Sequence, residues 1–187
     1  MVYLNKDLGI FIQDVDGELY RSSEWNGSKT ANGIAIKTEK HSFVMALQDA
    51  STNREVWASG SVLIDGITTT TDINEASNDY DGSNNTSAIT QHLYTGAATQ
   101  CAAFTFPNGK KGYLGAAGEH LIVLNNLSEI KNLLNKCGGA NLNIDYPYWT
   151  STQYDKNNKW KMDYGNYELS ASVLTLTCFV RAFASIQ

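Results

Sequence analysis

The sequence predicts an α+β domain, and three features carry this prediction. Residues 179–186 alternate between the two faces of a strand, at the period of two expected when a strand pairs with neighbours. Asp16-Gly17 separates two short strand-like stretches, as in a β-hairpin. Apolar residues at helical spacing between positions 127 and 137 add a helix. Because residues 9–13 alternate as the closing segment does, we expect the first and last strands to pair.

The N-terminal part of the sequence is predicted to form hairpins. Residues 10–13 lead into Asp16-Gly17, and residues 18–20 return along them. The acidic residues before Gly17 resemble the start of a calcium loop, but a third oxygen ligand and the distal Glu are missing, so the hairpin is favoured. Residues 33–36 and 42–47 predict two further buried strands.

The middle of the chain is less regular. Residues 57–85 are rich in Ser, Thr, Asn, Asp and Gly, which predicts a long irregular excursion over the surface. Residues 85–87 are expected to cap a helix containing Ile89 and Leu93. Residues 97–104 predict a second small helix before a turn at Pro107.

The most regular helix is expected between positions 127 and 137. Ser128 is predicted as the N-cap, and Gly138-Gly139 is predicted to end the helix. Its apolar stripe is interpreted as core: Leu127, Ile130, Leu133, Leu134 and Cys137. After it, residues 148–154 predict a strand, residues 155–158 a turn and residues 159–164 the returning strand.

Composition bounds the function. A chain of 187 residues without a linker-like stretch predicts one domain over residues 1–187. A net charge of −5 argues against nucleic-acid binding, which needs clustered Lys and Arg. No apolar segment approaches the roughly 20 residues that span a bilayer. Residues 1–7 lack the charged and apolar regions of a signal peptide, so we expect no export signal in this sequence.

Titratable residues form no recognisable catalytic or metal motif. Three widely spaced cysteines leave at least one thiol unpaired and do not make a disulfide framework: Cys101, Cys137 and Cys178. The three histidines never approach a metal-ligand spacing: His41, His92 and His120. No Ser, His and Asp grouping, phosphate-binding glycine loop or carboxylate pair stands out. We therefore expect neither an enzyme nor a cofactor or metal ion.

The late part of the chain carries a family resemblance. Tyr148-Trp149-Thr150-Ser151-Thr152, Trp160 and the closing Val180-Arg181-Ala182-Phe183-Ala184 resemble the C-terminal region of C-type-lectin-fold proteins diversified by retroelements in gut bacteria and their phages. Residues 112–119, a following helix and Gly138-Gly139 also match. The likeness covers residues 112–187 well and the N-terminal half more loosely. Leu114-Gly115-Ala116 stands where the family usually has Leu-Pro-Ser, which weakens the match to the related formylglycine-generating enzymes.

The resemblance implies a lectin-like fold with paired terminal strands and a receptor-binding role. The partner is expected to be a protein or a cell-surface ligand, and the location a phage tail or a bacterial surface. Two alternatives stay open: an adhesin or structural module without diversification, and an enzyme of the formylglycine-generating kind, for which no paired-cysteine motif is visible. The Glu-Pro-Asn and Trp-Asn-Asp motifs of calcium-dependent sugar binding are absent.

The resemblance also places the expected site between framework residues. The side chains expected to select the partner are Tyr154, Lys161, Glu168, Ser170, Ser172, Val173, Leu174 and Leu176. Val173, Leu174 and Leu176 are apolar among Ser and Thr neighbours, which is the pattern of a contact patch with a polar rim. The competing interpretation is an ordinary strand that buries these residues. Trp149, Trp160 and Phe183 are expected to be buried framework.

Overall fold

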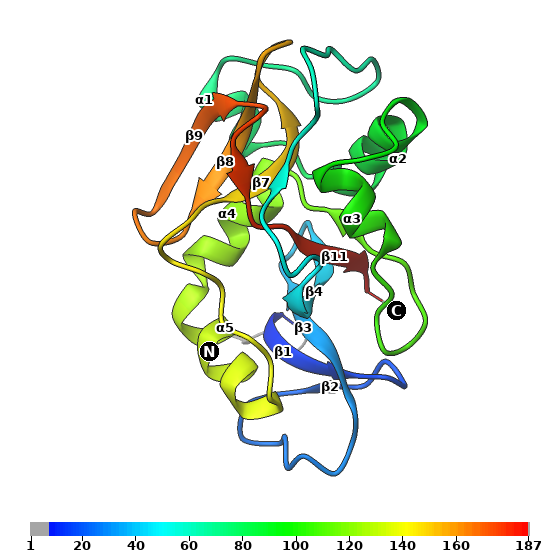
Figure 1. The fold of residues 1–187 in the computed structure, drawn as a ribbon. Helices are drawn as coiled ribbons and strands as arrows, with labels where there is room; N and C mark the ends of the chain where they lie inside the picture. The colour runs from blue at the N-terminus through cyan, green and yellow to red at the C-terminus, as the bar shows by residue number, and fades with distance from the viewer. Residues whose placement is uncertain (1–7, 187) are drawn as a thin grey trace.

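The structure is a computed structural model that describes residues 8–186 (Figure 1). Its first half contains β1 (Gly9–Asp14), β2 (Leu19–Tyr20), β3 (Ala31–Lys37), β4 (Ser42–Asp49), β5 (Glu55–Val56), α1 (Ile73–Ser77), α2 (Gly82–His92) and α3 (Ala97–Ala103). The second half contains β6 (Tyr113–Leu114), α4 (Ala117–Asn125), α5 (Leu127–Cys137), β7 (Tyr148–Gln153), β8 (Asn158–Asp163), β9 (Glu168–Val173), β10 (Thr177–Cys178) and β11 (Arg181–Ser185). Helices and antiparallel sheets together confirm the mixed α and β class.

Three sheets organise the described residues. The largest has the strand order β2-β1-β3-β4-β11-β6, the second is β7-β8-β9, and β5 pairs with β10. In Figure 1 the β7-β8-β9 sheet forms the upper part of the molecule, and α4 and α5 run down the side of the larger sheet. All ladders between named strands are antiparallel.

The predicted pairing of the first and last strands is wrong. Both belong to the six-stranded sheet, but β3 and β4 lie between β1 and β11. β1 pairs with β2 along one edge and with β3 along the other, and β3 pairs in turn with β4. β1 therefore has no free edge for β11. β11 pairs with β4 and β6 instead. Alternation identifies a paired strand, but it does not identify the neighbour.

Helix ends follow local sequence only in part. α5 ends as predicted, because Gly138 adopts φ 75°, a left-handed conformation that glycine reaches at little cost. The N-cap of α5 is Asn126 and not the predicted Ser128. α2 begins at Gly82, before the expected cap at residues 85–87. α1 and α4 were not anticipated; residues 117–125 are apolar on several sides of the helix and therefore show little periodicity.

The core lies on both faces of the larger sheet. Ile34 and Ile36 face a cluster shared with α4, α5 and one face of the β7-β8-β9 sheet. Ala35, between them, faces a second cluster with α3, Trp57 and Trp149. Trp149, Trp160 and Phe183 are all buried, as predicted. The first cluster covers one face of the β7-β8-β9 sheet, whereas the second covers the opposite face only around Trp149.

Candidate binding surface

Three buried tryptophans tie the irregular segment after β4 to the β7-β8-β9 sheet. The indole N–H of Trp57 donates to the Thr150 carbonyl at 2.8 Å. Trp149 donates to the Glu55 carbonyl at 2.8 Å. Trp160 donates to the Thr70 carbonyl at 2.9 Å. Because each bond joins segments about 90 positions apart, these side chains are framework, and replacing one removes both apolar burial and a long-range hydrogen bond.

A buried lysine strengthens the same junction. The ammonium of Lys159 donates to the Val62 carbonyl at 2.9 Å and to Gln153 Oε1 at 2.9 Å, and it also donates to the Asp155 carbonyl. It lies 4.8 Å from the centre of the Trp57 ring, within cation–π range. Burial lowers the pKa of Lys159 to about 8. Lys159 therefore holds the turn between β7 and β8 against the Val62 segment and is not available to a partner.

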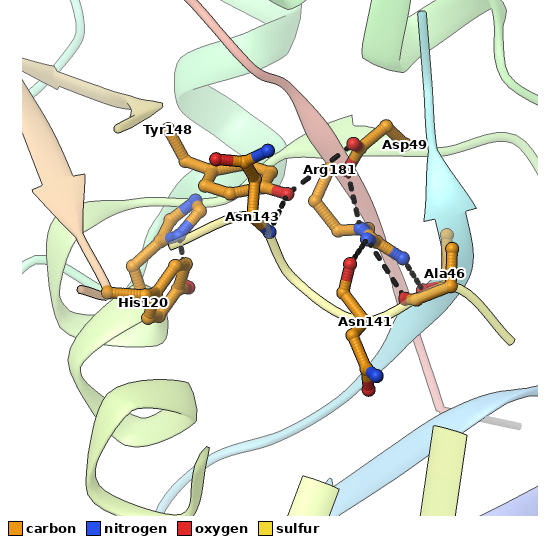
Figure 2. A network of polar contacts seen from close by, with 9 residues as sticks. Ala46, Asp49, His120, Asn141, Asn143, Tyr148 and Arg181 are labelled. Atoms are coloured by element: carbon orange, nitrogen blue, oxygen red, sulfur yellow. Dashed lines mark hydrogen bonds and ion pairs between the residues drawn. The ribbon is translucent and has the colours of Figure 1, made fainter. Parts of the chain in front are cut away.

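Arg181 anchors the loop that enters β7, as Figure 2 shows. Its side chain is fully buried, and its Nε lies 2.8 Å from Oδ1 of Asp49. The guanidinium also donates to the carbonyls of Ala46, at 3.1 Å, and Ala140, at 3.2 Å. Tyr148 extends this network, because its hydroxyl lies 3.4 Å from Asp49 Oδ2. A residue of the closing strand thus fixes the start of the second sheet.

Two other buried titratable groups near the second sheet have structural partners. Glu119 accepts the Ala116 N–H at 2.8 Å, which completes the start of α4, and the Tyr113 hydroxyl at 2.7 Å. Burial is the largest cause that raises the pKa of Glu119, to about 7. The Nδ1 atom of His120, which is labelled in Figure 2, lies 2.8 Å from the Tyr164 hydroxyl. Burial lowers the pKa of His120 to about 3. At neutral pH His120 is therefore uncharged.

No metal or disulfide chemistry appears in the described part of the chain. Across residues 8–186, no cluster of three or more His, Cys, Asp or Glu side chains could hold a metal ion. The three cysteines are free thiols. Burial raises the pKa of the Cys178 thiol to about 12, which keeps it protonated. No helix in this range is long and apolar enough to cross a membrane.

The expected contact residues divide between the two faces of the β8-β9 hairpin. Cross-strand pairing sets Lys161 opposite Ser170, and residues two apart share that face. The face therefore carries a polar row: Lys161, Glu168, Ser170 and Ser172. Glu168 is exposed, the other three are partly exposed, and the Lys161 ammonium donates to Ser170 Oγ at 3.1 Å. Tyr154 lies on the opposite face, where its partly buried ring packs 5.1 Å from that of Trp160.

The three apolar residues of the run separate into two groups. Val173 is 55% exposed and Leu176 is 38% exposed, so both side chains are available to a partner. Leu174 is only 3% exposed and belongs to the cluster around Trp57 and Trp149. Its expected place in a contact surface is therefore wrong, because its carbonyl accepts the Trp57 N–H at 2.9 Å and its side chain turns inward. The name "β9 surface" is used below for the exposed and partly exposed side chains on both faces of the β8-β9 hairpin and in the turn after it: Lys161, Glu168, Ser170 and Ser172 on one face, Val173 on the other, and Leu176 in the turn.

Other exposed apolar residues were not anticipated. Tyr167 is 70% exposed and has φ 57° in the turn between β8 and β9, a conformation that is uncommon outside glycine. With the exposed Ile144 it lines a groove of about 490 Å³ that runs along α4 and α5. The Gly165-Asn166 sequence before Tyr167 marks a turn, which was the available local signal. The exposure of the Tyr167 side chain depends on how distant segments pack, which the local sequence does not indicate.

Comparisons with known proteins support the fold. No family model matches the chain, and no curated protein matches its sequence. In three dimensions it is similar to a fimbrial protein from Bacteroides ovatus, known from a crystal structure at 1.85 Å resolution, with a TM-score of 0.66 and 16% sequence identity. The match covers 95% of this chain and 48% of the fimbrial protein. The chain thus corresponds to about half of that protein and shares the fold of the matched part.

Proposed function

We propose that this chain is a recognition domain of the adhesin type that binds a protein or polymer at a bacterial cell surface through the β9 surface. The observation that carries this proposal is a contrast within the β7-β8-β9 sheet and the turn that follows it. The inner residues are held by Trp149, Trp160 and Lys159, whereas Val173 and Leu176 are exposed among polar neighbours. A rigid scaffold with an apolar patch and a polar rim is what specific contact requires.

The fimbrial neighbour supports the location. At 16% sequence identity, the likeness to the fimbrial protein concerns the fold alone. A role at the cell surface is therefore part of the proposal. We further infer a C-type-lectin-like domain over residues 1–187, on the resemblance carried by Trp149, Trp160 and Arg181, with the departure that β1 and β11 share a sheet without pairing. The three side chains are buried, as framework residues should be. Non-catalytic function is also part of the proposal, supported by the structural partners of Glu119 and His120.

A second candidate is receptor recognition on a phage tail with sequence diversification. It is favoured by the position of Glu168, Ser170 and Ser172, which lie on an outer strand where substitutions leave the anchored part of the hairpin intact. Neighbouring DNA distinguishes the two candidates. An adjacent near-copy of the last 120 or so bases that differs mainly at adenines, together with a reverse transcriptase gene, supports diversification. A locus without either supports the adhesin.

Adhesion measurements test the proposed function. Beads coated with the folded chain are incubated with Bacteroides ovatus cells, with cells of unrelated species, and with the same cells after protease or periodate treatment. Saturable retention on at least one cell type is expected, and loss after one treatment identifies a protein or a glycan ligand. Equal retention of heat-unfolded chain, or retention that no excess of free chain displaces, contradicts specific recognition.

A further inference from the structure

The outer edge of β9 differs from the outer edge of β7. β9 is the last strand of the β7-β8-β9 sheet, and Figure 1 shows it at the outer side of this sheet. The outer edge of β7 is occupied along its length, because its amides donate to the carbonyls of Phe179, Gly115 and Thr68. Among residues 8–186, β8 is the strand that pairs with β9. One edge of the sheet is therefore closed and the other is open.

The direction of the β9 backbone groups follows from the neighbouring strand. The Trp160 carbonyl accepts the Thr150 hydroxyl at 2.9 Å, so Trp160 points its peptide groups toward β7. The peptide groups of the next residue, Lys161, therefore point toward β9, where the paired residue is Ser170. Beyond the hairpin, the Leu174 N–H donates to the Asn157 carbonyl at 3.0 Å, which agrees with this alternation. The N–H groups of Leu169, Ala171 and Val173, and the carbonyls of the first two, consequently point away from the sheet.

This edge lacks the usual protection against strand pairing. β9 has the sequence Glu-Leu-Ser-Ala-Ser-Val, without proline or lysine, and its register with β8 is continuous, without a bulge. The Ala171 side chain is exposed, and the exposed Val173 side chain lies on the same face of β9. An unprotected edge of six residues is long enough to accept an extended segment.

The charges along the edge indicate the chemistry of that segment. Glu168 lies directly opposite Asp163, an unfavourable arrangement of two carboxylates. Within residues 8–186 Glu168 forms no ion pair, and the Lys161 ammonium on this face donates to Ser170. A cation placed beside Glu168 would relieve the repulsion. On the other face, Ala171 and Val173 offer apolar surface.

We propose that β9 accepts an extended segment of a partner protein as a fourth strand of the β7-β8-β9 sheet. The segment carries apolar side chains on the face of Ala171 and Val173 and a lysine or arginine beside Glu168. This inference rests on the proposed recognition function and names the class of partner, a protein strand. Main-chain hydrogen bonds from Leu169 and Ala171 supply the contact, and the side chains select the sequence.

Hydrogen exchange measured by NMR tests the geometry and the binding together. The probe is the peptide acetyl-Val-Thr-Val-Thr-Val-Lys-amide, and the matched control has Glu in place of Lys. In the free chain, the amides of Leu169 and Ala171 should exchange faster than those of Ser170 and Ser172. Adding the lysine peptide should slow the first pair selectively, and the glutamate peptide should bind about tenfold more weakly.

Two variants sharpen the test. Ala171→Pro removes an outward N–H and places a ring on the edge, so peptide affinity should fall about tenfold or more while the fold is kept. Ser170→Pro removes an inward N–H and should unfold the hairpin, which confirms the assigned direction. Glu168→Lys should reverse the preference between the two peptides. The same Ala171→Pro chain is also measured in the cell-adhesion assay.

Three results would overturn the inference. One is peptide binding without protection of Leu169 and Ala171. Another is protection of these amides that depends on chain concentration without peptide, which identifies a second copy as the occupant. The third is full cell adhesion by Ala171→Pro, combined with loss of adhesion on replacing Val173 and Leu176. In that case the proposed function stands and the added strand does not.

Discussion

Replacing Arg181 by Met tests how the closing strand holds the second sheet. The substitution keeps an unbranched apolar stem but removes the guanidinium. Asp49 then loses its cation, and the carbonyls of Ala46 and Ala140 lose a donor. The loop before β7 should loosen, because these bonds join it to β4 and β11.

The magnitude follows from burial. Removing one member of a buried ion pair costs about 3–5 kcal/mol, because the other charge is left uncompensated. Asp49 is 22% exposed and can be partly hydrated, which places the expected loss at the lower end, about 3 kcal/mol. For a chain of this size the melting temperature should fall by roughly 6–12 °C.

Urea unfolding followed by tryptophan fluorescence measures this loss. Asp49→Asn is the matched comparison: it leaves the fully buried guanidinium without its anion, so it should cost at least as much, about 3–5 kcal/mol, although the two carbonyl acceptors remain. The double variant should cost less than the sum of the two single variants, since the partners act as a unit. A loss below about 0.5 kcal/mol for Arg181→Met would show that the network does not support the sheet.

Two further predictions concern buried rings. Burial lowers the pKa of His120 to about 3, so its stability contribution is complete above pH 6.5 and is lost as the pH falls toward 3. Between pH 7 and 4 the wild type should therefore lose about 3 kcal/mol more unfolding free energy than His120→Gln, and parallel curves would contradict the assignment. Trp160→Ala should cost about 3–5 kcal/mol, measured by urea unfolding, and an unchanged melting temperature would show that Trp160 is not a core residue.

Local signals in the sequence identified much of the scaffold. The Asp16-Gly17 turn, the end of α5 at Gly138 and the burial of Trp149 and Trp160 depend on the residues themselves and on their immediate neighbours. Turn chemistry and large apolar side chains act in the same way in most surroundings. These elements could therefore be predicted without knowledge of the tertiary structure.

Features decided by distant partners could not be predicted in this way. The order of strands in the larger sheet depends on which edges remain open after β1, β3 and β4 pair. Leu174 resembles its exposed neighbours in sequence, but β5 pairs with β10 and brings Trp57 against it. The export expectation concerns residues 1–7, which lie outside the described residues.

The most direct test of the recognition surface compares two variants of the same run. Val173→Ser/Leu176→Ser changes exposed side chains, and Leu174→Ser changes the buried one between them. The first should keep the wild-type melting temperature and lose cell adhesion about tenfold or more, since it removes the apolar centre of the contact. The second should destabilise the chain by about 2–5 kcal/mol. Normal adhesion by Val173→Ser/Leu176→Ser, or its unfolding at room temperature, would contradict a binding site on the β9 surface.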